Sequence, residues 1–317
     1  NGTEGILTEY SVRHDLKSNI AIETFDQSTG KIIKIIDEVK NTYGDFVAFG
    51  VVGKSVGLVE YQPERKFLHL LPFKYELLDP LDHNRISGDW KPQLTKGDRL
   101  FSVSESQGYS TTAMFGFNGG NGAEQTFVFG SNVANNTFGP LVPLEIRYFS
   151  YHNSPVMALD TATNDAIVAA GLDVPELAVV DLVTSNVNEF AGLGAGHVDG
   201  IAVDSADGIA CTTTLNDYSV EFYDLANNSG FLETLPGAGG ETQAGQDVQF
   251  DPVNKLFLID QPNCSQGPGA CIEVYDTQGN WVKAVSGLDS SGHIAFNPNT
   301  RTGFMQSGFF ELQSFSY

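Results

Sequence analysis

The chain has 317 residues, and its 39 acidic against 17 basic side chains give a formal net charge of −22. This charge repels phosphate backbones and anionic membranes, so nucleic acids and membrane surfaces are excluded as expected partners. The hydrophobic fraction of 41% is that of a folded globular protein, and no apolar run reaches the roughly 20 residues of a membrane-spanning helix.

The N-terminal region begins with a pair of expected strands. The stretch "NIAIETFDQSTGKIIKII" (residues 19–36) consists of an apolar strand, a polar turn after Asp26 and a second apolar strand. Apolar runs separated by turn residues are typical of a β-hairpin. The first residues, Asn1, Gly2 and Thr3, include neither an initiating Met nor a signal segment, so we expect a mature or trimmed product.

A second pattern recurs along the chain as six copies of one hairpin. Each copy has an apolar strand, a polar hinge residue, a short polar turn and another apolar strand, as in "VQFDPVNKLFLIDQP" from Val248. The hinge residues are, in chain order, Gln62, Lys91, Asp160, Asp204, Asp251 and Asn297. The last four are 44, 47 and 46 residues apart, which indicates a repeat of about 45 residues.

Later copies are followed by a second hairpin, whose first strand ends in Asp181, Asp224 or Asp276. Four short strands per repeat predict the four-stranded antiparallel blade of a β-propeller, an all-β fold. Six copies favour six blades, and the irregular stretches 37–56 and 131–153 leave room for a seventh. The chain ends in an incomplete repeat, so we expect one domain, 1–317, in which the N-terminal strands 1–36 complete the C-terminal blade 291–317.

The segment "DGIAVDSADGIACT" from Asp199 resembles the blades of NHL and SMP-30-like propellers, whose repeats often read Gly-Ile-Ala-Val-Asp. The resemblance covers residues 154–317 well and the first half of the chain only loosely. It implies a propeller but no single activity, because this architecture carries hydrolases, lyases, ligand carriers and interaction scaffolds.

Two groups of polar residues are candidates for a functional site. The hinge aspartates occupy equivalent positions in the repeat, but Asp and Asn at hairpin turns cap backbone amides, so we predict turn caps. The segments before each first strand lead, in a propeller, to the mouth of the central channel. These segments carry His152, Asn153, His197, Asp199, Gln246, Asp247 and His293.

The resemblance to SMP-30-like hydrolases implies a calcium ion at this mouth, held by Asn153, Asp199 and Asp247, with His197 or His293 as the base. Oxygen ligands suit Ca²⁺, and a bound ion would polarise a water or a substrate carbonyl. However, the glutamate that the family carries near the chain start has no clear counterpart, and the three ligands are not in one register. The alternative is that these residues only line a wet, polar channel.

Cys264 and Cys271 bracket the loop "CSQGPGAC", rich in Gly, Pro and Ser, and we predict a disulfide between them. Cys211, in the apolar run "GIACTT", is expected in the core. A disulfide needs an oxidising compartment and glycosylation sequons permit export, so we expect a secreted, extracellular or periplasmic protein. The sequons begin at Asn1, Asn135, Asn227 and Asn263.

The sequence contains no strong catalytic motif. "GKSVG" around Ser55 fits the nucleophile-elbow pattern, but it lies between two apolar runs typical of strands and predicts a hairpin turn. We therefore expect an exported scaffold that binds a small molecule, a glycan or a protein at its channel mouth or on a blade face. The alternatives are a calcium-dependent hydrolase of lactonase or esterase type and a structural subunit of an extracellular assembly.

Overall fold

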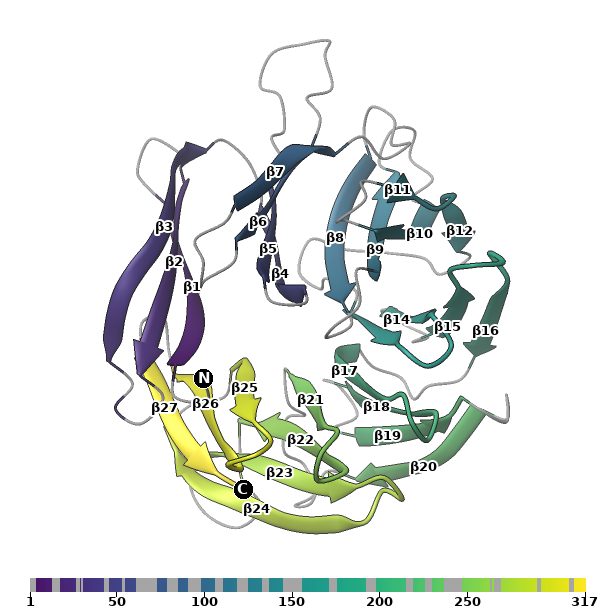
Figure 1. The fold of residues 1–317 in the computed structure, drawn as a ribbon. Coiled ribbons are helices and arrows are strands. Elements are labelled where there is room, and N and C mark those ends of the chain that lie inside the picture. The colour runs from purple at the N-terminus through teal and green to yellow at the C-terminus, as the bar shows by residue number, and fades with distance from the viewer. Residues whose placement is uncertain are drawn as a thin grey trace. The chain divides into compact units, whose positions relative to one another are not determined.

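The computed structural model of the chain consists of strands and turns, and no helix occurs among the residues that it describes. The described residues are 4–12, 18–26, 29, 31–42, 46–52, 55–60, 73–78, 85–90, 98–105, 111–118, 125–132, 137–144, 156–170, 176–191, 198–214, 219–225, 230–236, 247–262, 264, 269–289, 292–307 and 311–317. Their strands form seven sheets in which neighbours are antiparallel and mostly consecutive in the chain (Figure 1). This part of the chain contains no helix that is long and apolar enough to cross a membrane.

The chain divides into two compact units. Unit 1 comprises Asn1–Ala123 and Phe129–Leu141, and unit 2 comprises Glu124–Val128 and Val142–Tyr317. Unit 1 begins with sheet A, composed of β1 (Glu4–Val12), β2 (Ser18–Asp26) and β3 (Ile32–Thr42). A four-stranded sheet follows, composed of β4 (Phe46–Val52), β5 (Ser55–Glu60), β6 (Phe73–Leu78) and β7 (Arg85–Trp90).

The next sheet has the strand order β11-β10-β9-β8, and β12 also pairs with β10. Its strands are β8 (Asp98–Glu105), β9 (Thr111–Asn118), β10 (Gln125–Asn132), β11 (Thr137–Phe138) and β12 (Val142–Leu144). Phe127, Val128 and Phe129 of β10 are buried, as the apolar run in this strand leads one to expect.

Four further sheets of unit 2, D to G, each follow the chain order. Sheet D contains β13 (Val156–Asp160), β14 (Asp165–Ala170), β15 (Glu176–Asp181) and β16 (Val187–Ala191). Sheet E contains β17 (Val198–Asp204), β18 (Ile209–Thr214), β19 (Ser219–Asp224) and β20 (Gly230–Pro236). Sheet F contains β21 (Val248–Asp251), β22 (Leu256–Gln261), β23 (Ala270–Asp276) and β24 (Trp281–Leu288). Sheet G contains β25 (Ile294–Asn297), β26 (Thr302–Ser307) and β27 (Glu311–Ser316).

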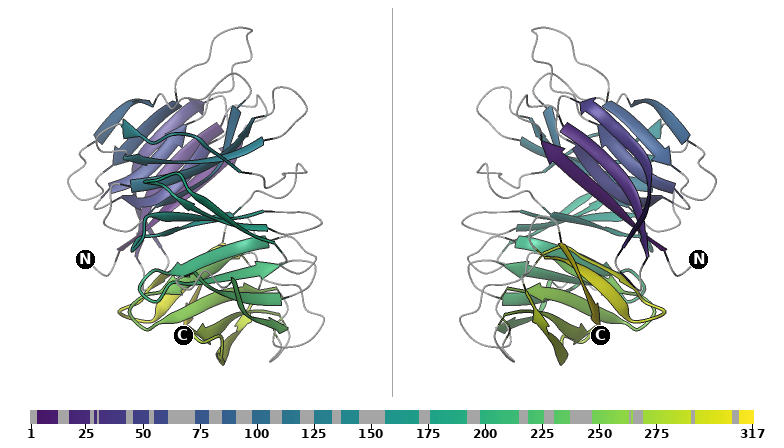
Figure 2. Two further views of the ribbon diagram at one scale, coloured as in Figure 1. Left: turned by 90° about the vertical axis from the view of Figure 1, so that its right-hand side faces the viewer. Right: turned by 90° about the vertical axis from the view of Figure 1, so that its left-hand side faces the viewer.

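The first strands β13, β17, β21 and β25 of these four sheets adjoin one another in sequence order. The fourth strands β16, β20 and β24 lie on the outer side of unit 2 (Figure 1). Figure 2 shows the twist of the strands in side view, which is the twist expected of L-residues in extended conformation.

The first hairpin of each of these sheets is built in the same way. The hinge residue accepts a hydrogen bond on Oδ1 from a backbone amide of its own turn, in the order Asp160, Asp204, Asp251 and Asn297. The residue four positions later has a left-handed backbone, with φ of 63° at Asn164, 67° at Gly208, 56° at Lys255 and 52° at Arg301. A side-chain cap followed by one left-handed residue reverses the chain within a short turn. The prediction that the hinge residues are turn caps is confirmed for these four.

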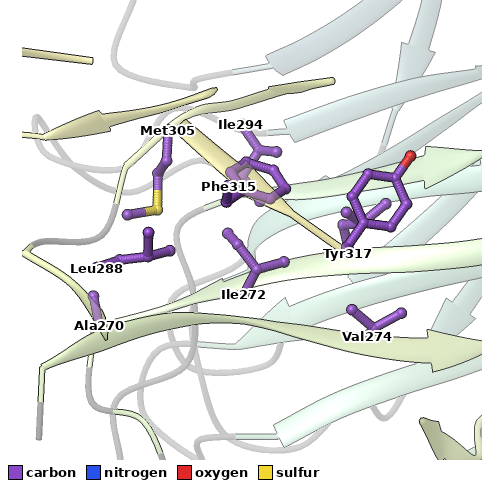
Figure 3. Packing of buried hydrophobic residues seen from close by; sticks show 9 residues of the cluster. Ala270, Ile272, Val274, Leu288, Ile294, Met305, Phe315 and Tyr317 are labelled. Atoms are coloured by element: carbon purple, nitrogen blue, oxygen red, sulfur yellow. The ribbon is translucent and has the colours of Figure 1, made fainter. Parts of the chain in front are cut away.

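Apolar side chains fill the spaces between successive sheets of unit 2. Tyr223 packs between sheets D and E, and Phe257 packs between sheets E and F, with its ring centroid 5.6 Å from that of Phe222. Figure 3 shows the cluster between sheets F and G, which includes Ile272, Met305 and Phe315. Full burial of one such side chain contributes about 1.5–3 kcal/mol, so each sheet is stabilised mainly by its neighbours.

Other fold predictions have mixed outcomes. β2 pairs with β3 after Asp26, as predicted, and Ser55 at the start of β5 pairs with Val52 at the end of β4, which agrees with the predicted hairpin. The hinge residues Gln62 and Lys91 lie outside the described residues. The terminal strands form two separate three-stranded sheets, A in unit 1 and G in unit 2. The number of blades and the completion of the C-terminal blade by residues 1–36 stay predictions.

Candidate functional site

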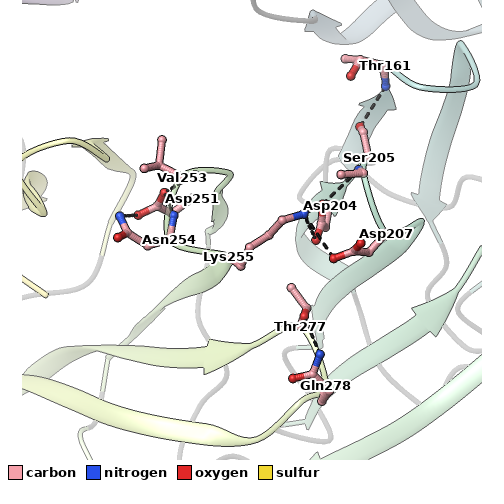
Figure 4. Close-up of polar contacts among 11 residues, drawn as sticks. Thr161, Asp204, Ser205, Asp207, Asp251, Val253, Asn254, Lys255, Thr277 and Gln278 are labelled. Atoms are coloured by element: carbon pink, nitrogen blue, oxygen red, sulfur yellow. Dashed lines mark hydrogen bonds and ion pairs between the residues drawn. The ribbon is translucent and has the colours of Figure 1, made fainter.

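We call the end of unit 2 that carries the hinge residues the turn end, and there Lys255 of sheet F extends back to sheet E. Its Nζ lies 2.9 Å from both carboxylate oxygens of Asp204 and 3.2 Å from Oδ2 of Asp207 (Figure 4). Asp204 is only 1% exposed, so the ammonium group compensates a carboxylate that is withdrawn from water. Burial alone lowers the pKa of Lys255, but the hydrogen bonds to Asp204 and Asp207 raise it overall. The hydrogen bond from Lys255 lowers the pKa of Asp207.

Sheets F and G are joined at the turn end by a second set of polar contacts. Arg301 donates from Nε and Nη2 to Oδ1 of Asn254 at 2.9 and 2.7 Å, and Asn254 donates to the carbonyl of Pro298 at 2.9 Å. The hydroxyl of Tyr317 donates to Oδ2 of Asp251 at 2.7 Å, and burial together with this bond raises the pKa of Tyr317. The hinge carboxylates are thus engaged in turns and between sheets, which is a structural role.

The opposite end of unit 2, where the first strands begin, brings two of the predicted site residues together. The backbone amide of Asp247 donates to Oδ1 of Asp260 at 2.7 Å, and Oδ2 of Asp247 accepts from the amide of Ile294 in sheet G at 2.7 Å. Oδ1 of Asp247 accepts from Nε2 of Gln249 at 3.0 Å. Nδ1 of His293 lies 3.9 Å from Oδ2 of Asp247, which is an ion-pair contact rather than a hydrogen bond. The Asp247 carboxylate therefore links sheets F and G.

His293 is the only one of the two predicted bases that lies among the described residues, and its side chain is 83% exposed. The interaction with Asp247 raises the pKa of His293, against a smaller lowering by burial. A raised pKa favours the imidazolium form, which cannot accept a proton. The predicted role of His293 as a base would need the neutral ring, the form that the contact with Asp247 disfavours.

Asp199 lies in β17 at a β-bulge, because the register shifts between Val198 and Gly200. The extra residue explains why Asp199 stands one position further from its hinge than Asp247 does. A Cβ added to Gly200 would lie 2.9 Å from the amide nitrogen of Val248 and 3.1 Å from the carbonyl carbon of Asp247. The backbone at Gly200, next to Asp199, thus lies in close contact with the backbone of Asp247 and Val248.

The remaining predicted ligands and modification sites lie outside the described residues; these are Asn153, His197, Asn1, Asn135, Asn227 and Asn263. In the described part of the chain, no three His, Cys, Asp or Glu side chains are grouped in a way that could hold a metal ion. The calcium site and the sequons stay predictions.

Cys264 and Cys271 form the predicted disulfide, with their Cα atoms 5.2 Å apart. It closes the loop between β22 and β23, where the amide of Cys264 also donates to the carbonyl of Gly269 at 2.8 Å. Cys211 is a free thiol buried in the core between sheets E and F, as predicted.

Two buried Glu–Tyr pairs were not predicted. Tyr275 donates to Oε2 of Glu273 at 2.8 Å, and Tyr223 donates to Oε2 of Glu221 in the equivalent place of sheet E. Both glutamates are 1% exposed, so the tyrosine hydroxyls supply hydrogen bonds that water would otherwise give. The sequence signal is the repeated Glu-x-Tyr-Asp of "SVEFYD" and "CIEVYD".

A second unpredicted feature is a pair of adjacent, exposed apolar side chains at the start of two last strands. Ile32 and Ile33 at the start of β3 are 46% and 49% exposed, and Trp281 and Val282 at the start of β24 are 42% and 47% exposed. The signal is a shared five-residue pattern, "GKIIK" in sheet A and "GNWVK" in sheet F. The sequence pattern does not reveal that these apolar residues face solvent; only their exposed fractions in the structure do.

The sequence matches no protein family in a scan of family models, and no curated protein matches it. Solved structures match it in fold. The β-propeller domain of Myceliophteria thermophila Cps50 (Swd1) aligns with a TM-score of 0.62 and 9% identity over 99% of this chain and 98% of that chain. The Dos1 propeller aligns with a TM-score of 0.61 and 10% identity over 94% of this chain and 79% of that chain.

Chaetomium thermophilum Sqt1, solved bound to the N-terminus of the ribosomal protein L10, aligns with a TM-score of 0.55 and 12% identity over 94% of this chain and 86% of that chain. At such low identities these likenesses show the fold alone. The chain is similar in fold to β-propellers, and its described residues form strands and turns without a helix, which confirms the all-β propeller part of the prediction but not six blades or their closure.

Proposed function

We propose that this protein is an interaction scaffold, a β-propeller that binds a partner protein through exposed parts of its sheets. The observation that carries the proposal is the repeated apolar pair, Ile32 and Ile33 in sheet A and Trp281 and Val282 in sheet F. Scattered single apolar residues are normal on a surface. Two adjacent ones in the same structural position of two sheets are better explained by a contact surface, where Trp is an efficient anchor.

Two further observations support a scaffold. Contacts such as Lys255 with Asp204 and Arg301 with Asn254 fasten the sheets of unit 2 to one another, and a preordered surface loses little entropy on binding. Sqt1, which is similar in fold, was solved bound to a terminal segment of another protein. A protein segment is therefore the partner that we propose ahead of a small molecule or a glycan.

Export of the protein is part of this proposal. The disulfide between Cys264 and Cys271 supports it, because such bonds persist in oxidising compartments and are rare in the cytosol.

The test is a cross-linking capture experiment with three forms of the protein. The wild type and a Val183→Ser control, which changes an apolar residue that is 75% exposed in a turn of sheet D, are expected to retain the same partner. The double variant Trp281→Ser/Val282→Ser is expected to lose it, with an unchanged unfolding midpoint. Equal capture by all three forms, or none above an unrelated acidic protein, contradicts the proposal.

A calcium-dependent hydrolase, as the resemblance to SMP-30-like blades implies, is the second candidate. The approach of His293 to Asp247 and the close backbones beside Asp199 and Asp247 favour it. A calcium site would raise the free energy of unfolding by about 2.7 kcal/mol at 100 times the Kd, and Asp199→Ala would remove that gain. An unfolding midpoint that neither CaCl₂ nor EDTA moves, in wild type and variant alike, rules this candidate out.

A further inference from the structure

We propose that Trp281 and Val282, with Lys283 beside them, form a docking site for an extended segment of a partner protein that carries apolar side chains next to a carboxylate. This inference rests on the proposed scaffold function and names the chemistry of the partner. We call these three residues of β24 the edge triplet.

The backbone geometry of β24 favours docking through side chains. β24 is the last strand of sheet F. Tyr275 pairs with Trp281 and Val274 pairs with Lys283, so Val282 is the extra residue of a β-bulge. A bulge twists an edge away from strand addition and changes the direction of its side chains. A second register shift near Ala270 shortens the regular part of the edge further.

The same arrangement occurs in sheet A, far away in the sequence. Phe25 pairs with Ile32 and Thr24 with Lys34, so Ile33 is the bulged residue there. Ile32, Ile33 and Lys34 are all exposed, as are the three members of the edge triplet. Packing inside a sheet does not explain a pattern whose side chains point to solvent, so its recurrence supports a role in contact.

The charge of the triplet selects the partner. Asp276, the carboxylate of the preceding turn, already accepts hydrogen bonds from the amides of Gln278 and Asn280 and from the side chain of Asn280. Lys283 is therefore the cation that an incoming carboxylate would meet beside the apolar pair. The bulge itself does not require Lys, because β20 has the same register shift and continues Phe231, Leu232, Glu233.

The overall charge limits the partner further. At a net charge of −22, a second copy of this chain or a strongly acidic segment is repelled at long range. A segment with apolar side chains and a single carboxylate gains the local attraction of Lys283 without a large long-range penalty. Such a segment is therefore the partner expected at the edge triplet.

The probe is a set of three synthetic ten-residue peptides in which Val alternates with Ser and one central Ser is replaced by Glu, Gln or Lys. The chain contains two tryptophans, so labelling with 5-fluorotryptophan gives two ¹⁹F NMR signals, and Trp281→Phe assigns one of them to Trp281. The Glu peptide is expected to shift the Trp281 signal and to bind about three- to fivefold tighter than the Gln peptide, as one exposed ion pair allows. The Lys peptide is expected to bind most weakly.

Variants separate the two components of the site. Lys283→Glu is expected to reverse the order of the Glu and Lys peptides, and Val282→Ser to weaken all three about tenfold or more through loss of apolar contact. Both positions are exposed, so the unfolding midpoint should stay unchanged.

Several outcomes would overturn the inference. These are a Trp281 signal that no peptide moves at millimolar concentration, an equal response to all three peptides, and an order that Lys283→Glu leaves unchanged. If the mass in solution is that of a dimer and Trp281 lies in the dimer interface, a second copy of the chain is the occupant instead. If the cross-linked partner still depends on Trp281 and Val282 while the peptides fail, the scaffold proposal stands and only the partner chemistry is rejected.

Discussion

Sheets D and F share the chemistry of their hairpins but differ in the residues around them. In both sheets an aspartate caps the first turn and another, Asp181 or Asp276, caps the second. The residue that pairs with both aspartates across the strands is Asp165 in sheet D and Leu256 in sheet F. The same backbone geometry thus holds three carboxylates in a row in one sheet and two separated by an apolar side chain in the other.

This difference has electrostatic consequences. Burial raises the pKa of Asp165, and the charges of Asp181 and Asp160 raise it further, against a lowering by a hydrogen bond from Thr163. The left-handed residue of the turn differs as well, because Asn164 stands in sheet D where Lys255 stands in sheet F. The capped turn thus sets the backbone geometry of both sheets, whereas residues at positions that the turn does not constrain set the charge balance and the link to the neighbouring sheet.

The core beneath these turns gives the largest expected difference. Phe257 of sheet F takes the place of Ala166 in sheet D, and its ring lies 4.7 Å from that of Phe250 and 5.6 Å from that of Phe222. We predict that Phe257→Ala lowers the free energy of unfolding by about 3–5 kcal/mol, because it leaves a cavity between sheets E and F. Urea denaturation followed by circular dichroism measures this loss.

Ile259 lies two residues further along β22 in the same cluster. Ile259→Val serves as the matched control, with an expected loss of about 0.5–1.5 kcal/mol in the free energy of unfolding. A loss for Phe257→Ala as small as that of the control would show that sheet F does not depend on the aromatic ring at this position.

The hinge residues and turns could be predicted from the sequence because their chemistry is local. Asp251 caps amides two and three residues away, and the disulfide spans a short loop. The contact between His293 and Asp247 also follows from the repeat, because both residues stand four positions before a hinge residue, in successive sheets.

Other features depend on partners that no local pattern reveals. To predict that Asp160, Asp165 and Asp181 stand in a row, one must know the register of three strands. The contact of Lys255 with Asp204 joins residues 51 positions apart, and the exposed pair at Trp281 needs knowledge of burial. A sequence pattern leads one to expect apolar residues in strands to be buried, so it gives no sign that these side chains are exposed.

The second prediction concerns the left-handed position of the first turn, where sheet F has Lys255 and sheet D has Asn164. Lys255→Asn keeps a residue that tolerates positive φ but removes the ammonium group from the buried carboxylate of Asp204. We expect a loss of about 1–3 kcal/mol in the free energy of unfolding at pH 7. Thermal unfolding measured from pH 2 to 8 checks both size and pH dependence.

The pH dependence has a definite sign. Asp207, which also binds Lys255, has a lowered pKa in the folded state, so its contribution is present above its ordinary pKa and is lost as the pH falls through the lowered value. The gap between wild type and Lys255→Asn should therefore be full at neutral pH and shrink in acid. Arg301→Asn, which removes a contact to the neutral Asn254, is the control, and its effect should not shrink in this way. A gap that is independent of pH would contradict the role of the carboxylates.

The smallest effect is expected from the reverse conversion, in which Asp165→Leu gives sheet D the apolar residue of sheet F. Like charges directly opposite each other on neighbouring strands cost a few tenths to about 1 kcal/mol, and the lower end applies because Asp165 is partly exposed and screened. Asp165→Asn, which removes the charge but adds no apolar surface, isolates this electrostatic part.

Because the pKa of Asp165 is raised above its ordinary 3.8, the unfolded chain ionises first as the pH rises, and the wild type loses stability between 3.8 and the raised value. Asp165→Asn should therefore match the wild type below this range and exceed it by a constant amount above it. A wild type that is the more stable of the two at neutral pH would mean that Asp165 makes a favourable contact in its ionised form, and that the row of carboxylates is a stabilising feature of sheet D.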